Sequence, residues 1–315
     1  MQSYNEILCI FYLLQIIIGV FGNGLLLFLY GFNLITSQRT RHIDVIFINL
    51  ALSHIVMILF RGVPLSIQVC IQKIFLSDIE CKIIIYLQRM SRGLTICNNC
   101  LLSVFQAITI SSSSPKGAEL KAKAAKYIFP SCVLLWVLNF LIDVDVPLHV
   151  TGTRNNTIGK FKRNLGFCFI DLHALSTSVI WKTFYDAVFV GLMAITSGYM
   201  AFIFFRHHSQ VQHLHNTSLN PTGSPEIRAT KVILLLMIIF VSFYSVASIF
   251  VIVMETSKDS PQWVTHISVF FTASYSTISP FVLIINDSQI LNCSRIFKRM
   301  QNFYLHSGRR RTFKS

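Results

Sequence analysis

The chain has 315 residues, of which 53% are hydrophobic and only 13% are charged. Soluble proteins carry roughly 25% charged residues, so this composition excludes an ordinary soluble domain and indicates a membrane protein. The formal net charge of +14 does not call for a nucleic-acid partner, because most of the basic excess lies beside apolar segments, where topology and attraction to anionic lipid explain it.

Seven apolar segments are long enough to cross a bilayer as helices, which takes about 20 residues each. They cover residues 7–32, 43–70, 81–111, 127–150, 178–205, 232–254 and 264–286. The segments are continuous apolar runs and lack the alternation of apolar and polar residues that barrel strands show. The sequence therefore predicts an all-α membrane protein, with a bundle of seven transmembrane helices over residues 1–286.

Basic residues are concentrated in the first, third and fifth loops and in the tail. Because cytoplasmic loops are enriched in Lys and Arg, we expect a multi-pass plasma-membrane protein with its N-terminus outside and its C-terminus in the cytoplasm. Residues 287–315 are the predicted tail. Apolar residues there recur every three to four positions, which predicts a short amphipathic helix with Cys293 as a lipidation candidate, followed by a basic end at 309–311.

Two cysteines and one sequon fall on the predicted outer side. Cys81 begins the third segment and Cys168 lies in the second outer loop, so both face the oxidising compartment and are expected to form a disulfide. Asn155 in the same loop is the expected N-glycosylation site. Cys97 and Cys100 lie in mid-segment with no histidine or second cysteine pair nearby, which favours packed side chains over a metal site.

Polar and charged side chains inside apolar segments are the candidate ligand contacts, because such residues are costly in a membrane. Gln88, Arg89 and Arg92 lie in the outer half of the third segment, and Asp186 lies at a comparable depth in the fifth. Asp186 is expected to face the arginines, either as a structural ion pair or as part of a ligand site. An excess of arginine over acid would favour acidic small molecules. Arg61 is a further candidate, for which snorkelling to the headgroups is the simpler explanation.

The sequence offers no constellation typical of an enzyme. Asp143 and Asp145 lie together near the outer end of the fourth segment and are not expected to form a site, and His54 is expected to be a packing residue. The predicted third inner loop contains a cluster of histidines, namely His207, His208, His213 and His215. We expect no cofactor and no metal, and membrane lipids are the partners that the apolar surface implies.

Motifs along most of the chain carry a family resemblance. The third segment reads Ser-Arg-Gly-Leu-Thr-Ile-Cys at 91–97 and Cys-Leu-Leu-Ser-Val-Phe-Gln-Ala-Ile-Thr-Ile-Ser at 100–111. The other matching positions are Gly22, Asn23, Asn49, Leu50, Ala51, His54, Trp136, Ser279, Pro280 and Phe281, with the sequon of the second outer loop. With these features the chain resembles the vomeronasal type-1 receptors, which are G-protein-coupled pheromone receptors of vomeronasal sensory neurons.

The resemblance implies a chemosensory receptor that detects a small pheromone-like molecule and activates an inhibitory-type heterotrimeric G protein. Phe105-Gln106-Ala107 stands where most rhodopsin-like receptors have Asp-Arg-Tyr, which makes Gln106 a candidate for the activating end. Pro280 is a candidate hinge, although a static kink fits equally well. Bitter taste receptors of type 2 share the missing arginine and are the nearest alternative. A seven-span channel or transporter is a more distant one, because no internal repeat is evident.

Overall fold

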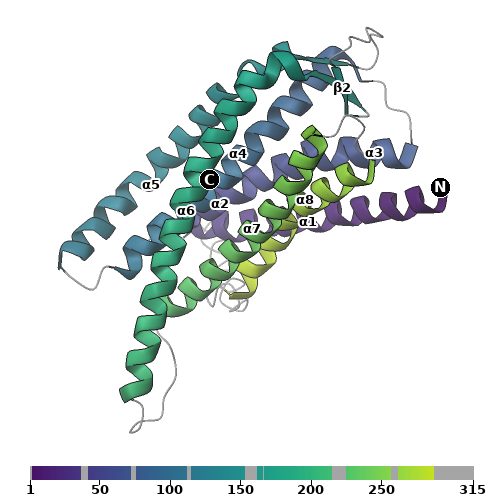
Figure 1. The fold of residues 1–315 in the computed structure, drawn as a ribbon. Helices are drawn as coiled ribbons and strands as arrows, with labels where there is room; N and C mark the ends of the chain where they lie inside the picture. The colour runs from purple at the N-terminus through teal and green to yellow at the C-terminus, as the bar shows by residue number, and fades with distance from the viewer. Residues whose placement is uncertain are drawn as a thin grey trace, which may run out of the picture.

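A computed structural model describes residues 2–36, 42–71, 76–111, 115–152, 162–165, 167–214, 225–256 and 262–286. The N-terminal helix α1 (Gln2–Thr36) is followed by α2 (His42–Met57), a π-helical turn η1 (Ile58–Gly62) and α3 (Val63–Ile71), which together make the second pass. Then come α4 (Asp78–Ile110), α5 (Pro115–Ile142), α6 (Leu172–Leu214), α7 (Pro225–Thr256) and α8 (Gln262–Asn286). The expected seven helical passes are therefore present in the described part of the chain (Figure 1).

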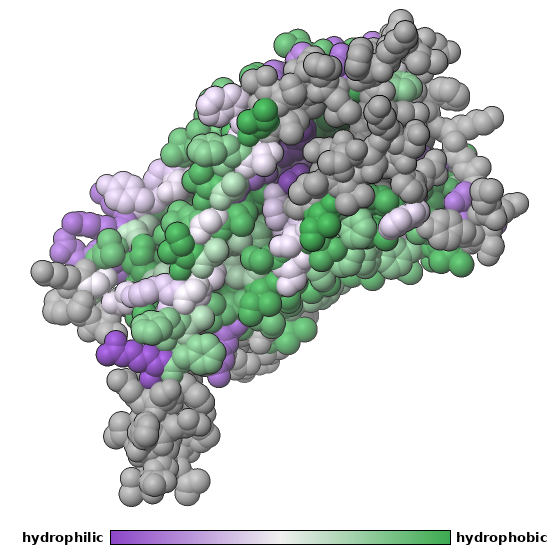
Figure 2. All heavy atoms as spheres, viewed as in Figure 1, coloured by the Kyte–Doolittle hydropathy of each residue, from purple (hydrophilic) through white to green (hydrophobic). Residues whose placement is uncertain are grey.

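Six of these passes are long and apolar enough to cross a membrane, and α7 contributes a shorter apolar stretch, Lys231–Ala247. Apolar side chains face outward along the bundle, for example Phe21, Phe129 and Ile195, which are 65%, 68% and 71% exposed. Figure 2 shows these hydrophobic residues covering the sides of the helices, with hydrophilic residues gathered near the turn from α4 to α5. Such a surface matches a lipid solvent, because hydrocarbon does not penalise exposed apolar side chains.

Helix α4 is the centre of the bundle. It packs against α2, α5, α6 and α7. Of its most apolar stretch, 67% is buried inside the bundle, whereas the value for α6 is 17%. Its start is fixed by a capping box, in which Ser77 Oγ accepts from the backbone N–H of Glu80 and Glu80 Oε2 accepts from the N–H of Ser77. The predicted third segment is thus the helix that every candidate site must contact.

The fourth helix begins earlier than the predicted segment 127–150 and includes the lysines that were expected in the loop before it. Helix α5 runs from Pro115 to Ile142, and the candidate membrane span Gly117–Leu148 covers most of the predicted segment. Lysine and alanine are good helix formers, so the stretch 116–126 extends the helix rather than forming a loop. Consequently Asp143 and Asp145 lie beyond the helix, in a turn that leads into the short helix η2 (Val146–Leu148).

A small antiparallel sheet caps the end of the bundle where α4 begins, which we call the sheet end (Figure 1). Strand β3 (Cys168–Asp171) lies between β1 (Val150–Gly152) and β2 (Lys162–Asn164). The predicted disulfide between Cys81 and Cys168 is confirmed, and it joins β3 to the first turn of α4. Asn155, Cys293 and the whole tail 287–315 lie outside the described residues, so the glycan, the lipid anchor and the eighth helix stay predictions.

A second disulfide, between Cys9 and Cys70, was not predicted. It joins the first turns of α1 to the last turn of α3 and so ties the first two passes together at the sheet end. Both cysteines fall within predicted apolar segments, where no pattern along the chain indicates their distance in space.

Replacing Cys9 and Cys70 with serine, singly or together, is expected to lower the thermal stability of the purified receptor. A native disulfide contributes about 2–4 kcal/mol, and the double variant should lose no more than either single one, because all three remove the same bond. Thermal unfolding in detergent measures the loss, and peptide mapping without reduction detects the bond. If the stability loss of the double variant equalled the sum of the two single losses, the two cysteines would not be bonded to each other.

Candidate functional site

Five charged side chains meet inside the sheet-end half of the bundle, and we call them the charged cluster. They are Arg89, Arg92, Asp143, Lys182 and Asp186. Asp143 is fully buried and holds two cations at once: Arg89 Nε donates to its Oδ1 at 2.9 Å, and Lys182 Nζ lies 3.0 Å from its Oδ2. One carboxylate at the end of α5 thereby fixes side chains from α4 and α6.

Neutral polar groups complete the surroundings of Lys182. Its Nζ donates to Asn139 Oδ1 at 3.2 Å, and Asn139 Nδ2 donates to the Tyr185 hydroxyl at 3.2 Å. The ammonium also lies 5.4 Å from the centre of the Tyr185 ring, within range of a cation–π contact. These partners offset part of the free energy of taking an ammonium group out of water.

The absence of a side chain at Gly93 of α4 allows Asn139 of α5 and Lys182 of α6 to approach that helix closely. A Cβ atom at this position would collide with Asn139 Oδ1 and with Lys182 Nζ. Any larger side chain would force apart groups that are already hydrogen-bonded to each other. The glycine of the third-segment motif thus has a steric role beside the cluster.

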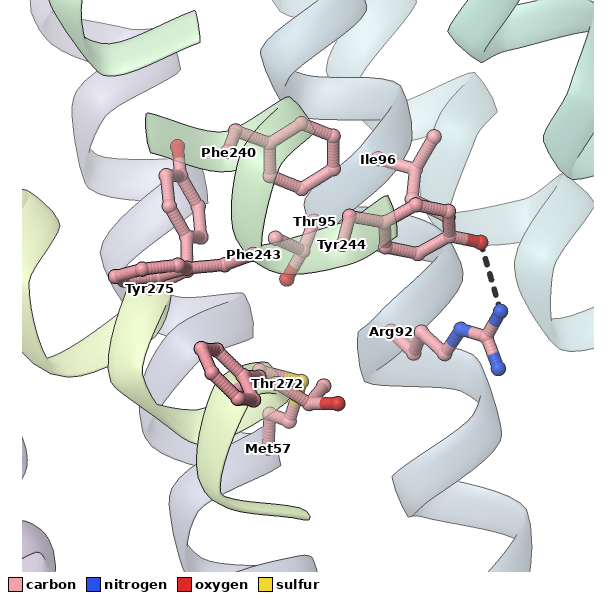
Figure 3. A pocket seen from close by; sticks show the side chains of 10 residues that line it. Met57, Arg92, Thr95, Ile96, Phe240, Phe243, Tyr244, Thr272 and Tyr275 are labelled. Carbon is pink, nitrogen blue, oxygen red and sulfur yellow. Dashed lines mark hydrogen bonds between the residues drawn. The ribbon is translucent and has the colours of Figure 1, made fainter. Parts of the chain in front are cut away.

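Arg92 lies one helical turn further into the bundle than Arg89. Its Nη2 donates to the Tyr244 hydroxyl of α7 at 2.7 Å and lies 3.8 Å from Asp186 Oδ2 of α6. Figure 3 shows the guanidinium beneath the Tyr244 ring, whose centre is 5.2 Å from the guanidinium carbon. Arg92 therefore bridges α4, α6 and α7, and the 3.8 Å separation leaves Asp186 without a close hydrogen bond from it.

A pocket opens beside Arg92 between α2, α4, α7 and α8. It is small and partly open to solvent. The lining is mostly aromatic or apolar, and it consists of Met57, Arg92, Thr95, Ile96, Phe240, Phe243, Tyr244, Phe271, Thr272 and Tyr275 (Figure 3). An apolar wall with a few convergent polar groups is typical of a site for a small organic molecule.

Tyr275 connects this pocket to the interior of the bundle. Its hydroxyl donates to Asn99 Oδ1 of α4 at 2.5 Å, and its ring packs edge-on against His54 of α2. Phe240 of α7 packs against the same ring, with 4.8 Å between ring centres. A molecule that displaced Tyr275 would therefore disturb α2, α4 and α7 together.

A buried polar network continues beyond Tyr275 to the proline of α8. Pro280 has no N–H to donate to the carbonyl of Ser276, and Asn23 Nδ2 donates to that carbonyl instead, at 2.8 Å. The other amide atom, Asn23 Oδ1, accepts from His54 Nδ1 at 3.2 Å. This network joins α1, α2 and α8 at the point where Pro280 interrupts the backbone hydrogen bonds of α8. His54 is a hydrogen-bonded packing residue, as expected.

The predicted site residues do not form one group in the structure. Arg92 lines the pocket and has Asp186 as its ion-pair partner, as expected. Arg89, for which Asp186 was a possible partner, forms its ion pair with Asp143. Gln88 does not line the pocket, and its Oε1 is buried without a partner in the described part of the chain. Arg61 lies in the π turn of the second pass.

Sequence reasoning missed both Asp143 and Lys182. Asp143 was expected to form no site because the fourth span was drawn too far along the chain, which hid the turn that brings the carboxylate inward. Lys182 carries a signal that was available, since it precedes Asp186 by four residues within an apolar segment, so the two share a helix face. A lysine in such a segment calls for a buried partner.

The far end of α4 contains the other predicted functional position. Gln106 is buried, with 3% of its surface exposed. Nearby, Ser103 Oγ lies 2.9 Å from Thr196 Oγ1, and Ser111 Oγ lies 2.7 Å from the Tyr199 hydroxyl. Contacts between hydroxyl groups therefore join α4 to α6 on either side of residues 105–107, the position at which most rhodopsin-like receptors have Asp-Arg-Tyr. Among the described residues, no group of three or more His, Cys, Asp or Glu side chains is arranged to hold a metal ion.

The geometry defines a class: a seven-helix membrane protein with an aromatic pocket and buried charges at its sheet end. The model of the vomeronasal organ pheromone receptor family matches residues 6–296. The chain therefore belongs to the vomeronasal type-1 receptor family.

Three similar proteins illustrate the relationship. Vomeronasal type-1 receptor 3 of Pan troglodytes is 38% identical over 85% of this chain and 87% of its own length. Vomeronasal type-1 receptor 4 of Homo sapiens is 33% identical over 90% of this chain and 96% of its own length. Olfactory receptor class A-like protein 1 of Danio rerio is 31% identical over 89% of each chain. The family that the sequence motifs resemble is thus confirmed, and the bitter taste receptor of type 2 is no longer an alternative.

Replacing Asp143 with alanine is expected to destabilise the receptor by about 3–5 kcal/mol, because the buried Lys182 and the partly buried Arg89 would lose their carboxylate. The change is measured as thermal unfolding of purified protein and as abundance at the cell surface. The matched control is Glu119→Ala, which breaks the exposed pair of Glu119 and Lys123 and should cost about 0–1 kcal/mol. Equal losses in the two variants would contradict the role of Asp143.

Proposed function

We propose that this vomeronasal receptor detects a small molecule in the pocket beside Arg92 and activates an inhibitory-type G protein at the opposite end of the bundle. The observation that carries the proposal is the pocket itself, which α2, α4, α7 and α8 form together. A molecule contacting several passes at once has different affinities for different packings of those passes. Such differential affinity is what a ligand needs in order to shift a population of conformations.

The sheet end is proposed to face the outside of the cell. Both disulfides lie at this end, and disulfides persist in oxidising surroundings rather than in the cytosol. Among the described basic residues predicted to be cytoplasmic, Lys121, Lys123 and Lys231 lie near the starts of α5 and α7 at the other end, in agreement with a cytoplasmic location. This orientation puts the N-terminus outside, the pocket within reach of extracellular ligands and the C-terminal tail inside.

Glycosylation tests this orientation. With the sheet end outside, Asn155 should carry a glycan, and digestion with an N-glycosidase should shift the mobility of the wild-type receptor. The variant Asn155→Gln should run at the digested position without treatment. A glycosidase shift that survives in Asn155→Gln would refute both the site and the topology.

The route from pocket to G protein is proposed to pass through Tyr275 and the Pro280 network. Movement of Tyr275 changes its bond to Asn99 of α4, and the interrupted ladder of α8 at Pro280 supplies a place where the helix bends. At the far end the hydroxyl contacts between α4 and α6 are weak enough to exchange, and Gln106 lies between them along α4. The lysines at the start of α5 would contact the G protein or anionic lipid.

Nucleotide exchange tests the receptor function directly. Membranes from cells expressing the full chain are mixed with a purified inhibitory-type heterotrimer and a panel of neutral, anionic and cationic single-ring and steroid-sized compounds. At least one compound should raise GTP exchange above that of membranes without the receptor. A compound that evokes ionic current with no exchange would overturn the proposal in favour of a channel.

The variant Thr272→Phe is expected to raise the half-maximal concentration of the active compound about tenfold or more, because the larger ring fills the pocket that Thr272 lines. The matched control is Ile285→Phe on the same helix, where the side chain is 61% exposed and the response should be unchanged. Unchanged responses in Thr272→Phe at equal surface abundance would show that the compound binds elsewhere.

A further inference from the structure

The wall of the pocket beside Arg92 leaves few hydrogen-bond donors for a ligand. Three of its hydroxyl groups already donate their hydrogen within the protein, at 2.5–2.9 Å: Thr95 to the carbonyl of Ser91, Thr272 to the carbonyl of Ser268, and Tyr275 to Oδ1 of Asn99. The other polar side chains on the wall are Arg92 and Tyr244, which are hydrogen-bonded to each other. The donors that a ligand can reach are therefore confined to this corner of the pocket, which we call the Arg92 corner.

Arg92 has more donors than partners. A guanidinium carries five N–H groups, and among the described residues only Nη2 has a hydrogen-bond acceptor, the Tyr244 hydroxyl at 2.7 Å. The Arg92 side chain is 35% exposed, and none of its nitrogens is among the fully buried, unpartnered atoms of the described chain. Figure 3 shows the second terminal nitrogen pointing away from the Tyr244 hydroxyl. The N–H groups of Nε and Nη1 are thus open to an acceptor that enters from the pocket.

Asp186 compensates the charge of Arg92. Its carboxylate is almost fully buried and lies 3.8 Å from Nη2. Arg89 and Lys182 both bind Asp143, so the excess of positive charge in the charged cluster lies there, and Arg92 forms a neutral pair with Asp186. A ligand carboxylate on Arg92 would lie close to the carboxylate of Asp186, and like charges repel strongly where water is scarce. The acidic ligands that an excess of arginine would favour are therefore not expected at the Arg92 corner.

The apolar part of the wall sets the shape of the occupant. Phe240 stacks on Tyr244 with 5.5 Å between ring centres, and Phe243 packs edge-on against Phe271 at 5.8 Å. All four rings line the pocket, which is small. Aromatic side chains arranged in this way pack well against another flat ring, and the space available favours a single ring over a larger fused system.

We propose that the pocket binds a neutral, single-ring compound through a carbonyl oxygen that accepts from Arg92, and that Asp186 sets this preference by compensating the charge of the guanidinium. A hydrogen bond from a charged donor is roughly twice as strong as one between neutral groups, so a carbonyl oxygen gains more here than at a hydroxyl. An anion would be attracted by Arg92 but repelled by Asp186, and it would also lose its hydration. The proposal rests on the receptor function proposed above and specifies its ligand class.

Three flat probes of nearly the same shape separate the parts of this ligand. Acetophenone has the ring and the carbonyl, 2-phenylpropene has a methylene group in place of the carbonyl oxygen, and benzoate has a carboxylate. Dissociation constants are obtained from the shift in thermal unfolding of the full-length receptor in phosphatidylcholine nanodiscs as probe is added. We expect acetophenone to bind at least about tenfold more tightly than the other two, since a hydrogen bond to a charged group contributes that much. Equal affinities of acetophenone and 2-phenylpropene, or tighter binding of benzoate, would overturn the proposal.

Substitutions assign the two roles. Arg92→Met removes the donors and should weaken acetophenone binding at least tenfold while leaving 2-phenylpropene binding unchanged. Asp186→Asn removes the compensating charge and should raise the affinity for benzoate at least tenfold. The matched control Lys123→Met removes one exposed cation and should have no effect. Wild-type affinity for acetophenone in folded Arg92→Met would overturn the role of Arg92, and an unchanged affinity for benzoate in Asp186→Asn would overturn that of Asp186.

Arg92→Met leaves Asp186 without its cation, so a second variant covers a failure to fold. The double variant Arg92→Met with Asp186→Asn contains neither charge of the pair, and it should show the same tenfold loss of acetophenone binding. Wild-type affinity for acetophenone in the double variant would contradict the proposal. The comparison of the three probes on the wild type decides the ligand class independently of any variant.

Two further arms distinguish another source of the carbonyl and other causes of failure. If acetophenone binds only in nanodiscs of ether-linked phosphatidylcholine, which has no ester carbonyls, the site takes lipid esters and the small-ligand proposal is wrong. If only anions, cations or compounds without an acceptor drive GTP exchange, the receptor function stands and the carbonyl preference fails. If acetophenone binds through Arg92 but no compound in the panel drives exchange, the site stands and the receptor function fails.

Discussion

The carboxylate of Asp143 is the constraint on which the sheet-end half of the bundle depends. Two cations from different helices, Arg89 and Lys182, converge on it. Neither could stay inside a lipid-embedded bundle without a counter-charge, and the carboxylate lies just past the end of α5, which fixes where that helix stops. The relative positions of α4, α5 and α6 therefore follow from one fully buried acid, with Gly93 providing the space for the approach.

Satisfying Asp143 with two cations has an effect on the neighbouring site. Because Arg89 and Lys182 are held there, Arg92 is left to the Tyr244 hydroxyl and a more distant Asp186. Of the two arginines three positions apart, Arg89 is thus held in a structural ion pair, whereas Arg92 lines the pocket. A side chain from another helix also supplies a missing partner near Pro280: the Ser276 carbonyl, which proline cannot bond, accepts a hydrogen bond from Asn23 of α1.

Much of this architecture could be predicted from the sequence, because apolar length and buried charge are local signals. They predicted seven passes and the Cys81–Cys168 bond. The remaining features depend on proximity in space: Asp143 reaches the cluster only because α5 ends earlier than its apolar run, and Cys9 meets Cys70 through the packing of two passes. The bond from Asn23 to the Ser276 carbonyl joins residues 253 positions apart, and no pattern along the chain indicates it.

The connectivity of the two disulfides has a consequence for how the receptor is made. The four bonded cysteines occur in the order Cys9, Cys70, Cys81 and Cys168, and the bonds join the first to the second and the third to the fourth. If the sheet end is translocated as proposed above, Cys70 and Cys168 each reach the oxidising compartment when their native partner is the most recent unpaired thiol among these four. Insertion of the passes in order, with oxidation keeping pace, gives the native pairs without reshuffling, whereas oxidation delayed until all four thiols are present allows three pairings.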